Sequence, residues 1–266
     1  SLGRCFGLLV SCIVGQYLLG AARFSAFIDP GFINPSTVRM AINRQVRSLI
    51  PSEATVVATD IQLNNLLHCR KTFRYISTHR IAEADYIVID LAETGNREEL
   101  VRYYGDMMRG GTLSSFTLVY ARLGVLVFRK GPQERGAEAE ILLDALPASA
   151  ERYRGSAGMD AFMAYEIVGD SLFPSNCGLK LYWSGDALGS IRTSMFRIAV
   201  LTAEGGRMQR LGGGTYFFGG GYALPGVVNG GGKIICDVIP LAVPPPTNRE
   251  IIIHLEPAEM PFGLLF

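Results

Sequence analysis

The pattern of hydrophobic and polar positions changes twice along the chain, and it begins with a long apolar run. Residues 5–22 (CFGLLVSCIVGQYLLGAA) contain no charged side chain, and Arg4 and Arg23 flank them. About 17 to 20 apolar residues cross the hydrocarbon core of a bilayer, and arginines at the ends can reach the aqueous interface. The run predicts a transmembrane helix over residues 1–24, followed by a linker over 25–34. A cleaved signal peptide and a buried core helix are the alternatives.

Small residues recur every fourth position in this segment and fall on one face of the predicted helix: Gly3, Gly7, Ser11 and Gly15. In a membrane, a face of small side chains lets another helix approach closely. The alternative is that Gly and Ser are simply frequent in membrane helices. The first interpretation predicts that the helix packs against its own copy or against other helices of a larger membrane assembly.

A helical period that alternates with short apolar runs follows the linker. Val38, Ile42 and Val46 recur at helical spacing up to Pro51, with Arg39 and Asn43 on the opposite side. Further helices are expected over 61–69 and 96–109, strands over 55–59, 72–76 and 84–91, and a hairpin over 116–121 and 125–129. Strands alternating with helices predict a small Rossmann-like α/β domain over residues 35–131.

The run at residues 84–91 (ADYIVIDL) is apolar on both faces apart from Asp85 and Asp90. Such a strand is typical of the centre of a covered parallel sheet. The two aspartates are five positions apart, so they point to opposite faces of the strand and cannot act as a carboxylate pair.

The helical period disappears from Ala161 onward, and short β-type runs separated by Gly, Pro and Asn take its place. They cover 162–168, 179–183, 195–202, 233–241 and 250–255. We expect an Ig-like or jelly-roll-type β-sandwich over residues 159–266, joined to the α/β domain by a linker over 132–158 with a short helix at 137–146. Trp183 is expected in the core of the sandwich, and a carbohydrate-stacking surface is the alternative.

A glycine-rich segment, LGGGTYFFGGGY at residues 211–222, lacks the sequence of a phosphate-binding loop, since no G-K-[ST] follows it and its surroundings are strands. We expect a flexible loop that exposes aromatic side chains as a docking surface. The residues concerned are Thr215, Tyr216, Phe217, Phe218 and Tyr222. The alternative is a mobile loop without a partner.

Composition and motifs exclude several function classes. The net charge is +1, so no basic surface indicates nucleic acid. The five cysteines form no C-x-x-C and the three histidines have no metal spacing, so neither a metal nor another cofactor is expected. No nucleophile–base motif is present, which predicts a protein that is not an enzyme. Cys177 and Cys236 fall in one predicted domain, as a disulfide or as two buried thiols.

One stretch resembles a known family. Residues 48–77 followed by ADYIVIDL carry Ile50-Pro51, a strand at Val56–Thr59, His68 with Arg70, Tyr75 and then Ala84-Asp85-Tyr86. This order resembles the C-terminal region of a family of bacterial multi-spanning membrane proteins with a domain of unknown function, which is similar to GT-C type glycosyltransferases. The resemblance covers roughly residues 1–130 and implies an extracytoplasmic, for example periplasmic, location. The family's chemistry is expected between membrane helices, and this chain shows one such helix.

The sequence therefore predicts a membrane-anchored, single-pass, non-catalytic structural or interaction subunit with extracytoplasmic domains. Its expected partners are the lipid bilayer and either other membrane-protein subunits or its own copies; no positive feature supports a glycan. One alternative is the C-terminal substrate- or glycan-binding region of a GT-C-like membrane glycosyltransferase. Another is a pilin-like filament subunit built around the apolar helix.

Overall fold

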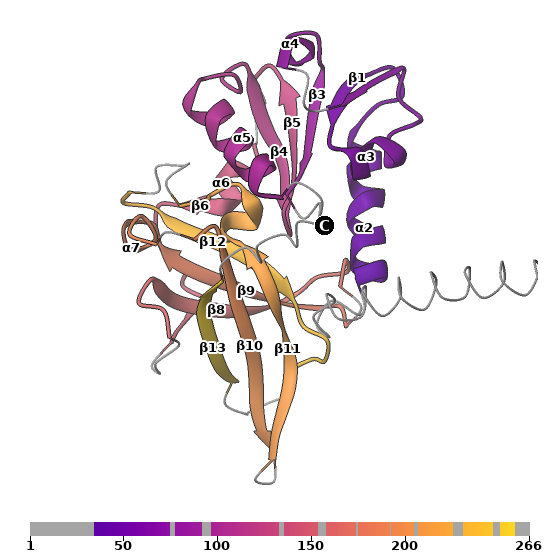
Figure 1. Ribbon diagram of the computed structural model, residues 1–266. Coiled ribbons are helices and arrows are strands. Elements are labelled where there is room, and N and C mark those ends of the chain that lie inside the picture. The colour runs from indigo at the N-terminus through magenta and orange to yellow at the C-terminus, as the bar shows by residue number, and fades with distance from the viewer. Residues whose placement is uncertain are drawn as a thin grey trace, which may run out of the picture. The chain divides into compact units, whose positions relative to one another are not determined.

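The computed structural model (Figure 1) describes ten stretches of the chain: residues 35–74, 78–91, 97–132, 136–153, 158–173, 175–191, 193–204, 207–225, 231–246 and 251–258. The predicted transmembrane helix, the linker and the small-residue face at Gly3, Gly7, Ser11 and Gly15 lie outside these residues. Within the described stretches, no helix combines the length and the hydropathy needed to cross a membrane. Residues 37–266 form one compact unit, which is mixed α/β with most of its ordered structure in three sheets.

The first sheet has the strand order β2-β1-β3-β5-β4. Its strands are β1 (Thr55–Ala58), β2 (Lys71–Arg74), β3 (Tyr86–Asp90), β4 (Phe116–Arg122) and β5 (Val125–Lys130), and its helices are α2 (Pro35–Leu49), α3 (Asp60–Asn65), α4 (Thr78–Ile81) and α5 (Arg97–Arg109). Strand β1 pairs in parallel with β2 and β3, whereas β5 is antiparallel to both β3 and β4. The predicted alternation of strands and helices and the predicted hairpin are confirmed.

Every residue of β1 and β3 is buried, as expected for central strands covered on both faces. Val88 on one face packs in the same cluster as Ile42 and Val46 of α2. Ile87 on the other face packs in the same cluster as Tyr104 of α5. The apolar positions read from the sequence are therefore the positions that hold the helices on the sheet.

The other two sheets are antiparallel. One has the order β6-β12-β9-β8-β7 and the other β11-β10-β13. Their strands are β6 (Leu142–Leu143), β7 (Glu151–Arg152), β8 (Phe162–Gly169), β9 (Cys177–Ser184), β10 (Met195–Glu204), β11 (Arg207–Phe217), β12 (Ile234–Pro240) and β13 (Ile251–Ala258). Single turns of helix occur at α6 (Glu138–Ile141), α7 (Gly185–Leu188) and η2 (Phe218–Gly221).

The segment expected to be a linker takes part in this structure. The predicted helix over 137–146 is limited to α6. Leu142 and Leu143, which follow it, pair with Ile235 and Ile234 at the edge of the antiparallel sheet β6-β12-β9-β8-β7. Strand β7 pairs with β8 at the opposite edge. The backbone groups of residues 142–143 and 151–152 therefore have hydrogen-bond partners in a sheet, which the local sequence pattern did not predict.

Trp183 lies in the core, as predicted, and is fully buried. Its ring is 5.5 Å from that of Phe162 on the same sheet and 4.8 Å from that of Phe196 on β10 of the other sheet. Phe218 lies edge-on to it at 5.2 Å. Aromatic pairs in this range add to the stability gained from burial, so this cluster joins the two antiparallel sheets.

Candidate functional site

The connections of the first sheet diverge between β1 and β3. Strand β1 leads through α3 to β2 on one side, and the chain then returns through α4 to β3 on the other side of β1. In open α/β sheets, ligands bind outside the carboxyl ends of the strands at such a switch point. Thr59 follows β1 there, and Asp90 is the last residue of β3.

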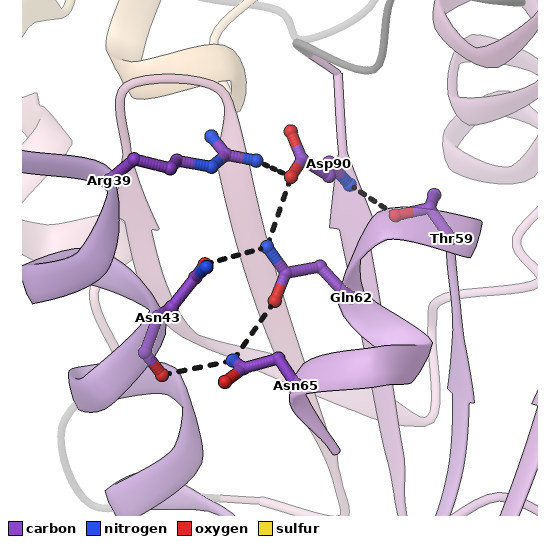
Figure 2. Close-up of polar contacts among 6 residues, drawn as sticks. All are labelled: Arg39, Asn43, Thr59, Gln62, Asn65 and Asp90. Atoms are coloured by element: carbon purple, nitrogen blue, oxygen red, sulfur yellow. Dashed lines mark hydrogen bonds and ion pairs between the residues drawn. The ribbon is translucent and has the colours of Figure 1, made fainter. Parts of the chain in front are cut away.

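Asp90 is the centre of a polar cluster at this edge (Figure 2). Its side chain is fully buried and forms an ion pair with the Arg39 guanidinium of α2. Gln62 Nε2 of α3 donates a hydrogen bond to Asp90 Oδ2 at 3.0 Å, and the backbone N–H of Asp90 donates to Thr59 Oγ1 at 3.2 Å. A carboxylate at this depth is stable only with such partners.

Two asparagines extend the cluster between α2 and α3 (Figure 2). Gln62 Nε2 lies 3.1 Å from Asn43 Oδ1, and Asn65 Nδ2 donates to the Asn43 carbonyl at 3.0 Å and to Gln62 Oε1 at 3.3 Å. Arg39 and Asn43 are spaced i, i+4 on α2, which places them on one face. The sequence predicted that Arg39 and Asn43 lie opposite the apolar face of the helix. In the structure Arg39 pairs with Asp90 and Asn43 contacts α3.

A second ion pair lies across the sheet from Asp90. Val125 of β5 stands between Asp90 of β3 and Arg122 of β4 in the register of the sheet. Arg122 pairs with Asp170, which follows β8, at 2.5 Å. With strands about 4.8 Å apart, about 10 Å separates the backbones of Asp90 and Arg122.

Tyr120 lies two residues before Arg122 on β4 and is 9% exposed. It packs in the cluster that α2 covers, and its hydroxyl has no hydrogen-bond partner among the described residues. Burial raises the pKa of Tyr120 to about 12, while the nearby Arg122 and Arg39 charges oppose that shift and Asp170 adds to it. The hydroxyl therefore keeps its proton at neutral pH and is available as a donor.

The glycine-rich segment is not the exposed loop that the sequence predicted. Residues 211–217 belong to β11, which pairs with β10, and residues 218–221 form η2. Phe217, Phe218 and Tyr222 are buried, and only Thr215 and Tyr216 are partly exposed. The predicted docking surface is therefore wrong for the three buried rings, because they fill the core between the sheets.

The second glycine triplet instead forms an internal joint. Gly219 and Gly220 have φ values of 58° and 63°, and their N–H groups donate to the Asp237 carboxylate at 3.1 and 2.7 Å. Trp183 Nε1 donates to the same carboxylate at 2.9 Å. Successive N–H groups in this conformation form an anion-binding nest, and the nest holds the chain's own Asp237. Burial raises the pKa of Asp237 to about 7, although the three donors act in the opposite direction.

The same turn contacts the first sheet. The Gly124 N–H, in the β4–β5 hairpin, donates to the Gly220 carbonyl at 2.9 Å, and the Tyr104 hydroxyl of α5 donates to the Tyr222 carbonyl at 3.1 Å. A Cβ at Gly220 would lie 2.9 Å from the Ala121 carbonyl oxygen. The turn therefore needs glycine both for its backbone conformation and for this approach.

Cys177 and Cys236 are free, buried thiols, which confirms the second of the two interpretations of the sequence, and no disulfide joins them. Cys236 is opposite Tyr182 in the register of β12 and β9, five residues from Cys177. At about 3.4 Å per residue this is about 17 Å, far beyond the Cα separation of up to about 7 Å that a disulfide spans. Burial raises the pKa of both thiols, and that of Cys236 to about 12.

Comparison of the chain with protein-family models, with curated proteins and with solved structures gives no significant match. The described residues contain no group of three or more His, Cys, Asp or Glu side chains that could hold a metal ion. Several residues of these clusters were missed from the sequence, among them Tyr120, Arg122, Gln62 and Asp237. Asp237 in the apolar run ICDVIP is a lone acid that could have been noticed, whereas nothing local distinguishes Gln62.

Proposed function

We propose that this protein is a membrane-anchored, non-catalytic structural or interaction subunit of a larger membrane assembly. Residues 1–24 provide the anchor, and residues 37–266 form a rigid extracytoplasmic body that presents surfaces to other subunits. In finer detail, we assign the first sheet to a Rossmann-like domain and the two antiparallel sheets to an Ig-like or jelly-roll-type β-sandwich.

The observation that carries this proposal is the joint around Gly220. The segment with the most glycine in the chain, where a flexible loop was expected, is fixed by hydrogen bonds with Asp237, with Gly124 and, at the Tyr222 carbonyl, with the Tyr104 hydroxyl. The buried residues of α5, β3 and β5 continue without interruption into those of β9, β10 and β12. A body fixed in this way suits support and contact rather than a cycle of opening and closing.

The anchor is tested on its small-residue face. The full chain is expressed in its native host, extracted in mild detergent and sized, with Gly7→Leu/Gly15→Leu as the test variant and Leu8→Ile/Leu18→Ile as the control. Bulky side chains on the predicted face prevent close helix approach, so the test variant is expected to leave the large particle while the control stays in it. A test variant that remains in the particle, or a wild-type protein that migrates as a single chain, contradicts the proposal.

A further inference from the structure

At the carboxyl edge of the first sheet lies a buried polar group for which the described residues provide no hydrogen-bond partner. The Tyr120 hydroxyl is buried without a hydrogen-bond partner among the described residues. An unsatisfied buried hydroxyl costs about 1 to 3 kcal/mol. A phenylalanine at position 120 would fill the same space in the core without this cost. Packing alone therefore does not account for the hydroxyl.

Two ion pairs flank the part of the sheet that carries the hydroxyl. Tyr120 lies in the row next to the one that carries Asp90, Val125 and Arg122, on the face of the sheet that α2 covers. The Arg39–Asp90 pair is at one end of that row and the Arg122–Asp170 pair at the other. The whole group is at the switch point, where open α/β sheets bind ligands.

The chemistry of the group favours an oxyanion with several oxygens. Arg39 and Arg122 are partly exposed, with 24% and 31% of their side chains accessible, whereas Asp90 is fully buried. Guanidinium groups donate to phosphate and carboxylate oxygens, and a protonated Tyr120 adds one more donor. Phosphate oxygens point in several directions, so a phosphate accepts from several donors at once, whereas a planar carboxylate accepts from fewer.

We propose that Tyr120, Arg39 and Arg122 form a binding site for a phosphate group at the carboxyl edge of the first sheet. In the free protein the Asp170 carboxylate forms an ion pair with Arg122, and the incoming phosphate replaces that carboxylate. Asp170 follows β8, which belongs to the antiparallel sheet β6-β12-β9-β8-β7. Release of the Arg122–Asp170 pair therefore also connects phosphate binding to that sheet. This site is independent of the proposed structural function and of the membrane anchor.

The test is calorimetric titration of the full chain in mild detergent with sodium phosphate, against sodium chloride at the same ionic strength. Tyr120→Phe removes only the unpartnered hydroxyl and leaves the core packing intact. Its control is Tyr165→Phe, which removes a hydroxyl that donates to Glu151 elsewhere. Arg122→Gln is paired with Arg109→Gln, whose guanidinium forms an exposed pair with Asp106.

Phosphate is expected to bind the wild type and both controls. Tyr120→Phe and Arg122→Gln should weaken the affinity by about 10- to 100-fold, the value of one hydrogen bond to a charged group. A parallel titration with glycerol 3-phosphate distinguishes the two sources of the phosphate. Tighter binding of glycerol 3-phosphate than of inorganic phosphate indicates a phospholipid headgroup, and the reverse order indicates a free phosphate. Phosphate heats equal to those of chloride in the wild type, or wild-type affinity in Tyr120→Phe, would overturn the proposal.

Discussion

Asp237 offers the sharpest prediction, because it is a buried carboxyl group with three N–H donors and, among the described residues, no charged partner that lowers its pKa. Burial raises its pKa from 3.8 to about 7. A raised carboxyl pKa means that the folded state binds the proton more tightly than the unfolded state. The stability that this proton contributes is therefore fully present below about pH 4 and is lost as the pH rises through about 7.

The expected magnitude follows from the size of the shift. One pKa unit corresponds to about 1.4 kcal/mol, so a shift of about three units makes the free energy of unfolding fall by roughly 4 kcal/mol between pH 4 and pH 7. Asp237→Asn cannot titrate and lacks this fall. Its amide oxygen keeps the bonds from Trp183 and Gly219, but its NH₂ group faces the Gly220 N–H, which leaves buried donors unpaired at about 1 to 3 kcal/mol each.

The assay is urea unfolding of wild type and Asp237→Asn, followed by the fluorescence of Trp183, at a series of pH values between 4 and 8. The variant should be clearly less stable at pH 5, and the difference from wild type should shrink as the pH rises to 7. Groups that titrate in both proteins cancel in this difference. A difference that stays constant with pH would show that Asp237 does not titrate in this range, and a difference that grows would reverse the sign of its pKa shift.

Three further predictions follow from the same contacts. Asp90→Ala removes the buried carboxylate that pairs with the Arg39 guanidinium and accepts from Gln62, and should lower the free energy of unfolding by about 3 to 5 kcal/mol in urea titrations; a loss under 1 kcal/mol would mean that the pair is solvated. Gly220→Ala, crowded by Ala121 O, should lower the melting temperature more than Gly232→Ala, which has the same sign of φ and open space. Cys236, whose pKa burial raises to about 12, should react with a thiol reagent only after unfolding; rapid reaction of the native thiol would contradict its burial.

The sequence predicted the parts of the fold that depend on local periodicity. Val38, Ile42 and Val46 mark the buried face of α2 because a helix repeats every 3.6 residues, and ADYIVIDL marks a central strand because both its faces are apolar. Trp183 was placed correctly for the same reason, since its strand alternates. Each of these inferences needed only neighbours along the chain.

The contacts that form the candidate site could not be predicted in this way. Arg39 meets Asp90 and Gly220 meets Asp237 across 51 and 17 positions of sequence. Two glycine triplets around aromatic residues are typical of a loop, and only the pairing with β10 and the presence of Asp237 make this segment a strand and an internal joint. Long-range partners decided the structure where the local pattern was ambiguous.

The central claim, a non-catalytic subunit of a membrane assembly, is tested most directly by the intact mass of this polypeptide within particles extracted in mild detergent from its native source. The account predicts that the polypeptide carrying these residues is recovered together with other subunits or further copies of itself. A single, much longer polypeptide with many hydrophobic segments would contradict it and would assign these residues to the C-terminal region of a multi-spanning enzyme.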